Sequence, residues 1–108
     1  MADRFLDVWV TCPDRAAADR IAEACVAERL AACANVLAPA SSIYRWDGAV
    51  ERADEVPLVF KTRAALFDRL AARIRTLHPY EVPAIVATAL SPVEPACAAW
   101  LRQETRED

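Results

Sequence analysis

One glycine in a chain of 108 residues is the feature that most limits what this sequence can fold into. It stands at position 48, directly after Asp47, between two runs rich in β-forming residues. An Asp-Gly pair in that setting predicts a two-residue hairpin turn, because a type I′ turn needs positive φ at both central residues. The Walker loop and the G-x-G-x-x-G dinucleotide motif each need several glycines, so this chain has neither of them.

The length of the chain fits one domain, residues 1–108, and leaves no room for a second. Hydrophobic residues make up 56% and charged residues 27%, a balance typical of a packed globular protein rather than a disordered one. The formal charge is −3 and Lys61 is the only lysine, so we expect no nucleic-acid partner. The chain shows neither a secretory signal nor 18 uninterrupted apolar residues, which predicts a cytoplasmic protein without a membrane span.

The hydrophobic periodicity predicts the element order β-α-β-β-α-β-α. The four expected strands are 5–11, 33–46 with an interruption at 38–42, 49–61 and 82–90, and the expected helices are 14–30, 62–77 and one that begins at 91–92. This order predicts an α+β, ferredoxin-like split β-α-β sandwich, in which two helices cover one face of an antiparallel sheet. The other face and the hairpin arms carry Phe5, Trp9, Tyr44 and Trp46, so we expect an oligomer to cover them.

Local features carry expectations of their own. Pro57 has no N–H to donate, which predicts an edge strand or a bulge at that position. Thr62 is interpreted as the cap of the second helix. Ser91 and Pro92 are expected to begin the last helix, and residues 102–108 are expected to fray.

The four cysteines form no C-x-x-C pair and have no histidine spaced for a zinc site. We expect all of them to be thiols, as is usual in a reducing cytosol. Cys25, Cys33 and Cys97 are interpreted as small core residues. Cys12 ends a predicted strand just before a helix, a position where a thiol can be exposed.

The segment 77–83 is the richest in functional groups, because it combines the imidazole of His78, the phenol of Tyr80 and the carboxylate of Glu81 in a loop that also holds two prolines. It is either a rigid connection, with His78 capping a helix and Tyr80 at an interface, or part of a binding site. A catalytic Cys–His pair would require His78 to meet a thiol in the folded chain. Lys61 is either a solvated lysine or the partner of an anion.

Several blocks of the sequence together resemble the CutA divalent-cation tolerance family. They are Thr11-Cys12-Pro13-Asp14, Leu30-Ala31-Ala32-Cys33-Ala34-Asn35, Ser42-Ile43-Tyr44-Arg45-Trp46-Asp47-Gly48, Glu55-Val56 with Lys61-Thr62, and His78-Pro79-Tyr80-Glu81-Val82-Pro83. The resemblance implies a cytoplasmic, PII-like homotrimer with long hairpins, linked to tolerance of copper and other divalent cations. It implies no catalytic reaction. The resemblance also implies that His78 is the position at which a metal ligand is expected. The first-strand cysteine is a separate matter: some members of the family place it where this chain has Val10, two residues before Cys12.

We therefore expect a non-enzymatic trimer that binds a divalent cation such as Cu²⁺. Imidazole suits such ions, which makes His78 the leading candidate ligand, with Glu81 and Cys12 as further metal ligands. The alternatives are a PII-like trimer that binds a small anionic metabolite at its subunit clefts, or a trimeric scaffold for another protein. Candidate residues for a ligand cleft are Lys61, Tyr80, Tyr44 and Trp46, although the last two are equally interpreted as interface aromatics.

Overall fold

The computed structural model describes residues 4–107 and confirms the α+β class. In chain order its elements are β1 (Phe5–Cys12), α1 (Arg15–Ala27), β2 (Cys33–Val36), β3 (Ala40–Trp46), β4 (Ala49–Arg63), α2 (Phe67–Leu77), β5 (Ile85–Leu90) and α3 (Pro95–Glu104). The main sheet has the order β2-β4-β1-β5, and every neighbouring pair in it is antiparallel. β3 pairs with the first half of β4 to form the hairpin.

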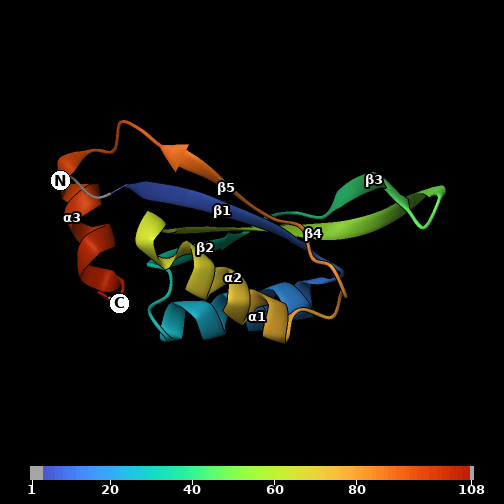
Figure 1. Cartoon of the computed structure of the whole chain (residues 1–108), viewed down its shortest axis with the longest axis horizontal. Coiled ribbons are helices and arrows are strands. Elements are labelled where there is room, and N and C mark those ends of the chain that lie inside the picture. Colours follow the sequence, from blue (N-terminus) through green and yellow to red (C-terminus); the bar gives the residue numbers. More distant parts are fainter. Residues whose placement is uncertain (1–3, 108) are drawn as a thin grey trace.

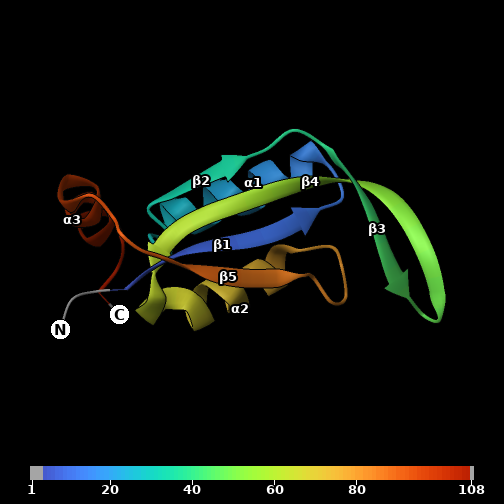
Figure 2. The same cartoon turned by 90° about the horizontal axis from the view of Figure 1, so that it is seen from above.

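Helices α1 and α2 lie side by side on one face of the sheet, and α3 closes one end of the molecule (Figure 1). The hairpin projects from the opposite end, which gives the chain its long dimension of 45 Å against 25 and 23 Å. The other face of the sheet is largely open (Figure 2). No helix within residues 4–107 is long and apolar enough to cross a membrane.

The two-residue period of β1 explains which face the helices cover. Val8, Val10 and Cys12 are fully buried or nearly so, and they pack in the same cluster as Ile21 of α1 and Ile74 of α2. Trp9 points the other way and is exposed. Successive side chains of a strand alternate between faces, so one hydrophobic run supplies both the core and an open apolar face.

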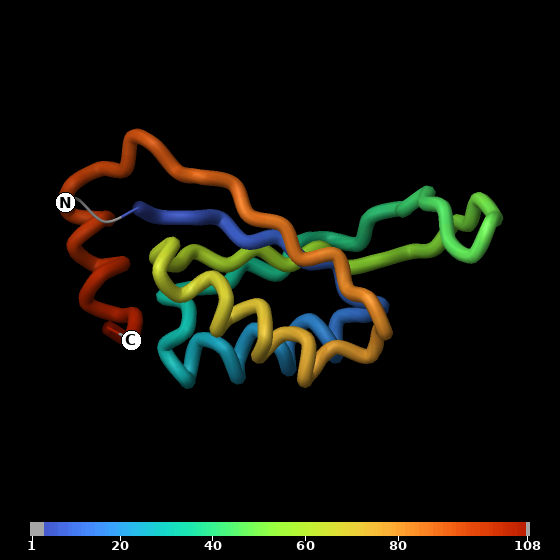
Figure 3. The backbone as a smooth tube through the Cα atoms, in the orientation of Figure 1, coloured from blue at the N-terminus to red at the C-terminus, as the bar shows by residue number. Residues whose placement is uncertain are grey.

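The predicted hairpin turn is present, with φ of 50° at Asp47 and 80° at Gly48. Beyond the turn, β4 is one strand of 15 residues. Its first half pairs only with β3, whereas its second half lies between β1 and β2. The same strand therefore anchors the sheet and carries the projecting hairpin, as the backbone trace shows (Figure 3).

Of the two settings predicted for Pro57, the edge strand is wrong, because β4 has partners on both sides of this position; the bulge agrees with the pairing, since residues 37–39 stand opposite only residues 56–57. Pro57 pairs with Thr11 of β1, and its carbonyl oxygen accepts a hydrogen bond from the N–H of Leu37 on the other side. That second side is the break between β2, which ends at Val36, and β3, which begins at Ala40. The backbone nitrogen of Pro57 faces this break, where no neighbouring strand requires a hydrogen bond from it. A central strand can therefore hold a proline at this position.

Two predictions about element ends are wrong. Thr62 lies inside β4, where its buried hydroxyl donates to the carbonyl of Leu30, 2.7 Å away, instead of capping a helix. The last helix begins at Pro95, and its cap is Glu94, whose carboxylate accepts from the N–H of Cys97 at 2.9 Å. Ser91 and Pro92 lie before that helix and are joined by a cis peptide bond.

The C-terminal segment is held in place through residue 106 rather than frayed, and the N–H of Arg106 donates to the carbonyl oxygen of Arg29 at 2.9 Å. The side chain of Thr105 is buried, and its hydroxyl accepts a hydrogen bond from Nε of Arg63 at 3.0 Å. Arg29 donates to the carbonyls of Gln103 and Glu104. These contacts join the end of α3 to the sheet and to the turn after α1, and Asp108 lies outside the described residues.

The cysteines are all free, as expected, but they are distributed differently from the prediction. Cys25 is a core residue. Cys33 is half-buried, and Cys97 is exposed on α3. Cys12, expected to be accessible, is fully buried because the inward face of β1 extends to its last residue.

Replacing Gly48 with valine should lower the free energy of unfolding by about 1–2 kcal/mol, since a side chain with a Cβ disfavours positive φ. A Cβ at position 48 meets no other atom within 4 Å, so backbone strain is the only source of the loss. Urea unfolding at fixed protein concentration measures it. Ala49→Val introduces the same side chain at a strand position of ordinary φ, and it should have little effect. Equal stability of the two variants would contradict the assignment of the turn.

Candidate functional site

A cleft of about 700 Å³ lies between the hairpin and the loop that follows α2. Its lining comes from three parts of the chain: the end of β1, both arms of the hairpin, and residues 79–84. The lining residues are Thr11, Ser42, Ile43, Tyr44, Trp46, Glu51, Glu55, Pro79, Tyr80, Glu81, Val82 and Ala84. The structure thus brings Tyr44, Trp46, Tyr80 and Glu81 together, all of which were candidate site residues.

His78 fixes the loop on one side of this cleft. Its own N–H continues the α2 hydrogen-bond pattern by donating to Ile74, and its ring Nδ1 accepts from the N–H of Tyr80 at 3.1 Å. Since Nδ1 accepts, the proton is on Nε2, which donates to the carbonyl oxygen of Thr11 at 2.8 Å. Both ring nitrogens are therefore engaged in joining the loop to the end of β1, and the ring is buried behind the cleft wall.

Tyr80 connects the loop to the hairpin strand. Its hydroxyl donates to Oε2 of Glu55 at 2.7 Å, and its ring packs against the ring of His78 with centroids 4.8 Å apart. Burial and the hydrogen bond to the Glu55 carboxylate raise the pKa of the Tyr80 hydroxyl. Tyr80 therefore remains a neutral donor across the physiological range, and it holds the Glu55 carboxylate in one position.

Cys12 lies behind the same wall. Burial first, and then the negative charges of Glu55 and Asp14, raise the pKa of its thiol to about 11. The thiol is therefore protonated at neutral pH, whereas nucleophilic attack and metal binding both require the thiolate. The ring nitrogens of His78 form hydrogen bonds with the backbone of Thr11 and Tyr80 rather than with a thiol. The catalytic Cys–His pair considered from the sequence is therefore not formed.

Lys61 does not reach the cleft. Its ammonium group donates to a carboxylate oxygen of Asp7 at 2.8 Å, on the open face of the sheet. This hydrogen bond is the main reason that the pKa of Lys61 is raised. Lys61 and Glu55 are six residues apart on one strand, or about 20 Å at 3.3 Å per residue. Of the two interpretations of Lys61, the carboxylate partner is the one that the structure confirms.

The charged lining of the cleft is entirely acidic. Glu51 and Glu55 come from the same face of β4, and Glu81 comes from the loop. Glu81 also lines a smaller hollow of about 430 Å³ at the mouth, together with Trp46 and Asp47. Among residues 4–107, no lysine, arginine or histidine contributes to either lining.

Sequence reasoning missed three of these carboxylates. Glu51 and Glu55 carry a detectable signal, because residues four apart in a strand share a face. Asp47 was assigned only to the turn. Within the described part of the chain, no three histidine, cysteine, aspartate or glutamate side chains lie close enough together to hold a metal ion. A metal at the cleft therefore needs further donors from water or from a second subunit.

Comparison with known proteins gives a consistent result over nearly the whole chain. The model of the family described as CutA1 divalent ion tolerance protein matches residues 6–104. Among curated proteins, the divalent-cation tolerance protein CutA of Thermus thermophilus is 43% identical over 98 residues, which is 91% of this chain and 95% of that protein. Protein CutA of Mus musculus is 39% identical over 97 residues, and this chain spans only 55% of its length.

Solved structures agree with the sequence matches. The crystal structure of CutA1 from Oryza sativa superposes with a TM-score of 0.95 at 34% identity, covering 99% of this chain and 98% of that one. The five strands and three helices described above are thus those of a known fold, including the projecting hairpin.

Proposed function

This chain belongs to the CutA1 divalent ion tolerance family, and from that premise we propose that it is a non-enzymatic homotrimer that binds a divalent cation such as Cu²⁺. The observation that carries the proposal is the charge of the cleft. Three glutamates line it and no cationic side chain of residues 4–107 does, so its potential attracts cations. The alternative of a small anionic metabolite loses its main support, because Lys61 lies elsewhere and is paired with Asp7.

The mouth of the cleft is the best place for the ion. Glu81 and Asp47 both line the hollow there, and carboxylate oxygens are ligands for divalent cations. His78 would have to give up its hydrogen bond to Thr11 or to Tyr80 before a ring nitrogen could bind a metal. Cys12 would have to lose a proton and become accessible. We therefore propose Glu81 as the first ligand, with His78 and Cys12 as ligands only after such a rearrangement.

The trimer is supported by apolar surface that a single subunit leaves exposed. Ile43 and Val50 on the hairpin, and Trp9 and Val86 on the open face of the sheet, are all exposed. Three strands also have a free edge within the described residues, because β2 and β3 each pair only with β4 and β5 pairs only with β1. Exposed apolar patches together with free strand edges are typical of surfaces that associate with another copy.

Light scattering should give a mass near three times 11.9 kDa at micromolar protein concentration. Val50→Asp should reduce that mass, because it places a charge on the exposed apolar side of the hairpin. Asp19 on α1, whose side chain is 47% exposed and pairs only with Arg15 of the same helix among the ion pairs described, provides the control as Asp19→Asn, which should remain trimeric. A monomeric parent protein would refute the trimer.

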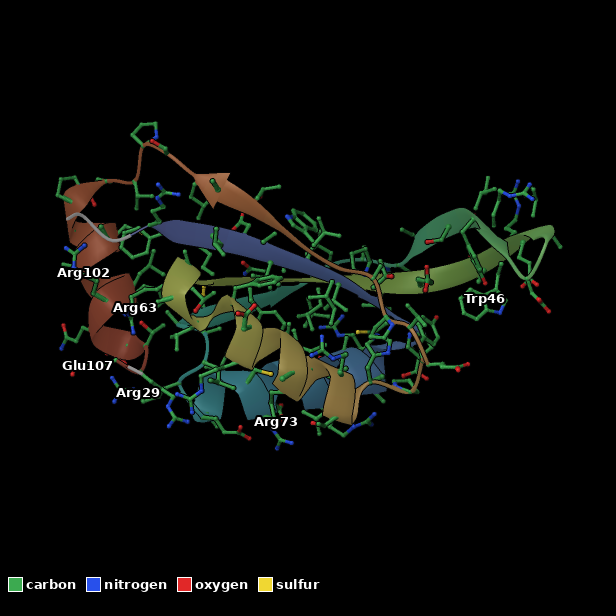
Figure 4. All side chains as sticks on the ribbon, viewed as in Figure 1. Arg29, Trp46, Arg63, Arg73, Arg102 and Glu107 are labelled. Atoms are coloured by element: carbon green, nitrogen blue, oxygen red, sulfur yellow. The ribbon has the colours of Figure 1, made fainter. Side chains whose placement is uncertain are left out.

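Isothermal titration with Cu²⁺ and Zn²⁺ tests the ligand assignment. We expect Glu81→Gln to weaken binding by about tenfold or more, since it removes a ligand charge. Glu107→Gln removes a charge from an exposed carboxylate at the other end of the molecule and should bind as the parent does (Figure 4). His78→Ala should cost less than Glu81→Gln.

The pH dependence separates the candidate ligands. Imidazole ligands begin to exchange the metal for a proton below about pH 6.5, whereas carboxylates do so near about pH 4.3. Binding through Glu81 should therefore change little between pH 7 and pH 5.5. A marked loss at pH 5.5 that disappears in His78→Ala would move the site to His78, and unchanged binding in both variants would exclude the cleft mouth.

A further inference from the structure

Two of the four cysteines, Cys33 and Cys97, do not line the cleft. Cys33 is half-buried at the start of β2, whereas Cys97 is exposed in the first turn of α3. Helix α3 lies at the end of the sheet where β2 begins, as the two views in Figures 1 and 2 show. The fold therefore places side by side two elements that are far apart in the chain and that each carry a thiol.

Cys33 points to the open face of the sheet. Ala34 and Val36 of the same strand pack against the core on the helix side, so the alternation of side chains along β2 turns Cys33 the other way. The register places Cys33 directly opposite Lys61, which in turn lies directly opposite Asp7. A thiol, an ammonium group and a carboxylate therefore form a row across three strands, and the 2.8 Å ion pair between Lys61 and Asp7 is part of it.

The packing of α3 brings Cys97 to the end of this row. Ala98 and Leu101 are the buried residues of α3. They pack in one cluster with Ala32, the residue immediately before Cys33. Cys97 precedes Leu101 by four residues, and residues four apart lie on the same side of a helix. Cys97 therefore lies beside the contact through which α3 packs against the start of β2.

The electrostatic interactions of these groups agree with that placement. Burial raises the pKa of the Cys33 thiol; Lys61 acts against it through its charge and its backbone hydrogen bond, and the negative charges of Asp7 and Cys97 add to the increase. The pKa of Lys61 is raised first by its hydrogen bond to Asp7, and the charges of both thiols add to it. The charge of Cys97 thus acts on both Cys33 and Lys61. A nearby ammonium group favours the thiolate, which is the form of cysteine that reacts with oxidants.

We propose that Cys33 and Cys97 form a reactive dithiol that a hydroperoxide oxidises to a disulfide within one subunit, with Cys97 as the thiol that is attacked first. Cys97 is exposed and therefore within reach of the peroxide, and Cys33 is the second thiol that resolves the oxidised product. Oxidant-sensitive cysteines are typically accessible and lie next to such a resolving cysteine. Cys12 and Cys25 are fully buried, so they should stay reduced. The proposal goes beyond the binding of a cation and does not depend on it.

The oxidation has two steps. The Cys97 thiolate attacks one oxygen of the hydroperoxide and the O–O bond breaks, which leaves a sulfenic acid on Cys97, while the departing oxygen takes up the proton that Cys97 released. The sulfur of Cys33 then attacks the sulfur of Cys97, the S–O bond breaks, and the hydroxide leaves as water with the proton of Cys33. Each sulfur is oxidised by one electron and the peroxide is reduced by two. Two thiols and one hydroperoxide thus give one disulfide, one alcohol (water in the case of H₂O₂) and one water.

Mass spectrometry of the full chain treated with H₂O₂ tests the proposal. A chelator is present, so that Cu²⁺ does not act as the oxidant. The subunit should lose the mass of two hydrogen atoms, and peptide mapping should join residue 33 to residue 97. On a denaturing gel without reductant the oxidised chain should still run as a single subunit. A disulfide between two copies, a pair that includes Cys12 or Cys25, or thiols that stay unchanged in excess peroxide would each overturn the proposal.

Two variants and one control assign the roles of the thiols. Cys97→Ser should lower the rate of H₂O₂ consumption by about tenfold or more, because it removes the thiol that is attacked first. Cys33→Ser removes the resolving thiol, so the sulfenic acid on Cys97 should accumulate and be trapped by dimedone. Cys25→Ala removes a buried thiol and should form the disulfide as the parent does. Cys97 is exposed, so its variant remains informative if Cys33→Ser fails to fold. A dimedone adduct on any cysteine other than Cys97, or an unchanged rate in Cys97→Ser, would refute the assignment.

Discussion

Replacing Phe60 with alanine should lower the free energy of unfolding by about 3–5 kcal/mol, the usual cost of emptying a phenylalanine site in a core. Phe60 is fully buried in the second half of β4, in the cluster that joins the sheet to α1 and α2. Because β4 pairs with β1, β2 and β3, a cavity beneath it weakens the strand on which the sheet and the hairpin both depend.

Urea unfolding at a fixed protein concentration measures this loss, since an oligomer's stability depends on concentration. Phe60→Leu retains most of the side-chain volume and should cost less than about 1.5 kcal/mol. A loss below about 1 kcal/mol for Phe60→Ala would show that this cluster is not the main core.

Raising the pH from 8.5 to 11 should destabilise the protein by several kcal/mol. Burial is the first cause that raises the pKa of Cys12 to about 11 and of Cys25 to about 12, and nearby carboxylates add to it. Thiols of the unfolded chain ionise from about pH 8.5, so the unfolded state loses these protons first. The stability is therefore fully present below about pH 8.5 and is lost as the pH rises through 11 to 12, at up to about 1.4 kcal/mol per pH unit and thiol.

The double variant Cys12→Ala, Cys25→Ala should have a much flatter profile of unfolding free energy against pH. Cys97→Ala removes an exposed thiol and should keep the profile of the parent. Both are compared by urea unfolding in the presence of a phosphine reductant, which prevents disulfide formation. A profile that stays flat to pH 11 in the parent would contradict the burial of the two thiols.

The turns and helix ends that depend only on adjacent residues were the part of the fold that the sequence predicted best. The Asp47-Gly48 turn depends on the φ of two adjacent residues, and the end of α2 depends on a proline one position beyond His78. Both are properties of neighbouring residues. The hydrophobic periods of β1 and α1 likewise define their buried faces without knowledge of their partners.

The errors concern residues whose environment is set by distant segments. Thr62 would cap a helix in isolation, but its hydroxyl has a partner in the carbonyl of Leu30. The C-terminal segment contains many charges, yet Arg63 and Arg29 fix it in place. Pro57 is tolerated in a central strand only because the break between β2 and β3 lies beside it. No pattern within a short window predicts such contacts.

The candidate site also divides into features that the sequence predicted and features that depend on contacts between distant segments. The sequence identified Tyr44, Trp46, Tyr80 and Glu81 as functional candidates, and the structure places all four around one cleft. It did not predict that His78 would serve to fix the loop, because that depends on the carbonyl of Thr11, which is 67 positions away in the chain. Nor did it separate Lys61 from the cleft. Both Lys61 and Glu55 lie on the one expected strand 49–61, but Glu55 was not recognised as a cleft residue, so the strand length between them could not be used.

The acidic lining of the cleft would attract a cation even though the described residues of one subunit hold no complete set of metal ligands. Glu51, Glu55 and Glu81 come from the hairpin and the loop that face each other across the cleft, and the hairpin also carries the exposed side chains of Ile43 and Val50, on which the proposed trimer would form. Assembly of the trimer and completion of the cation site are therefore expected to depend on each other.

The most direct test of the central claim is to locate the ion. Crystals of the unmodified protein grown with Zn²⁺ and measured at the zinc absorption edge should show an anomalous peak at the cleft mouth. The peak should lie about 2.0–2.2 Å from a carboxylate oxygen of Glu81, the usual Zn–O distance. A strongest peak at any other position, or an empty cleft at saturating Zn²⁺, would contradict the account.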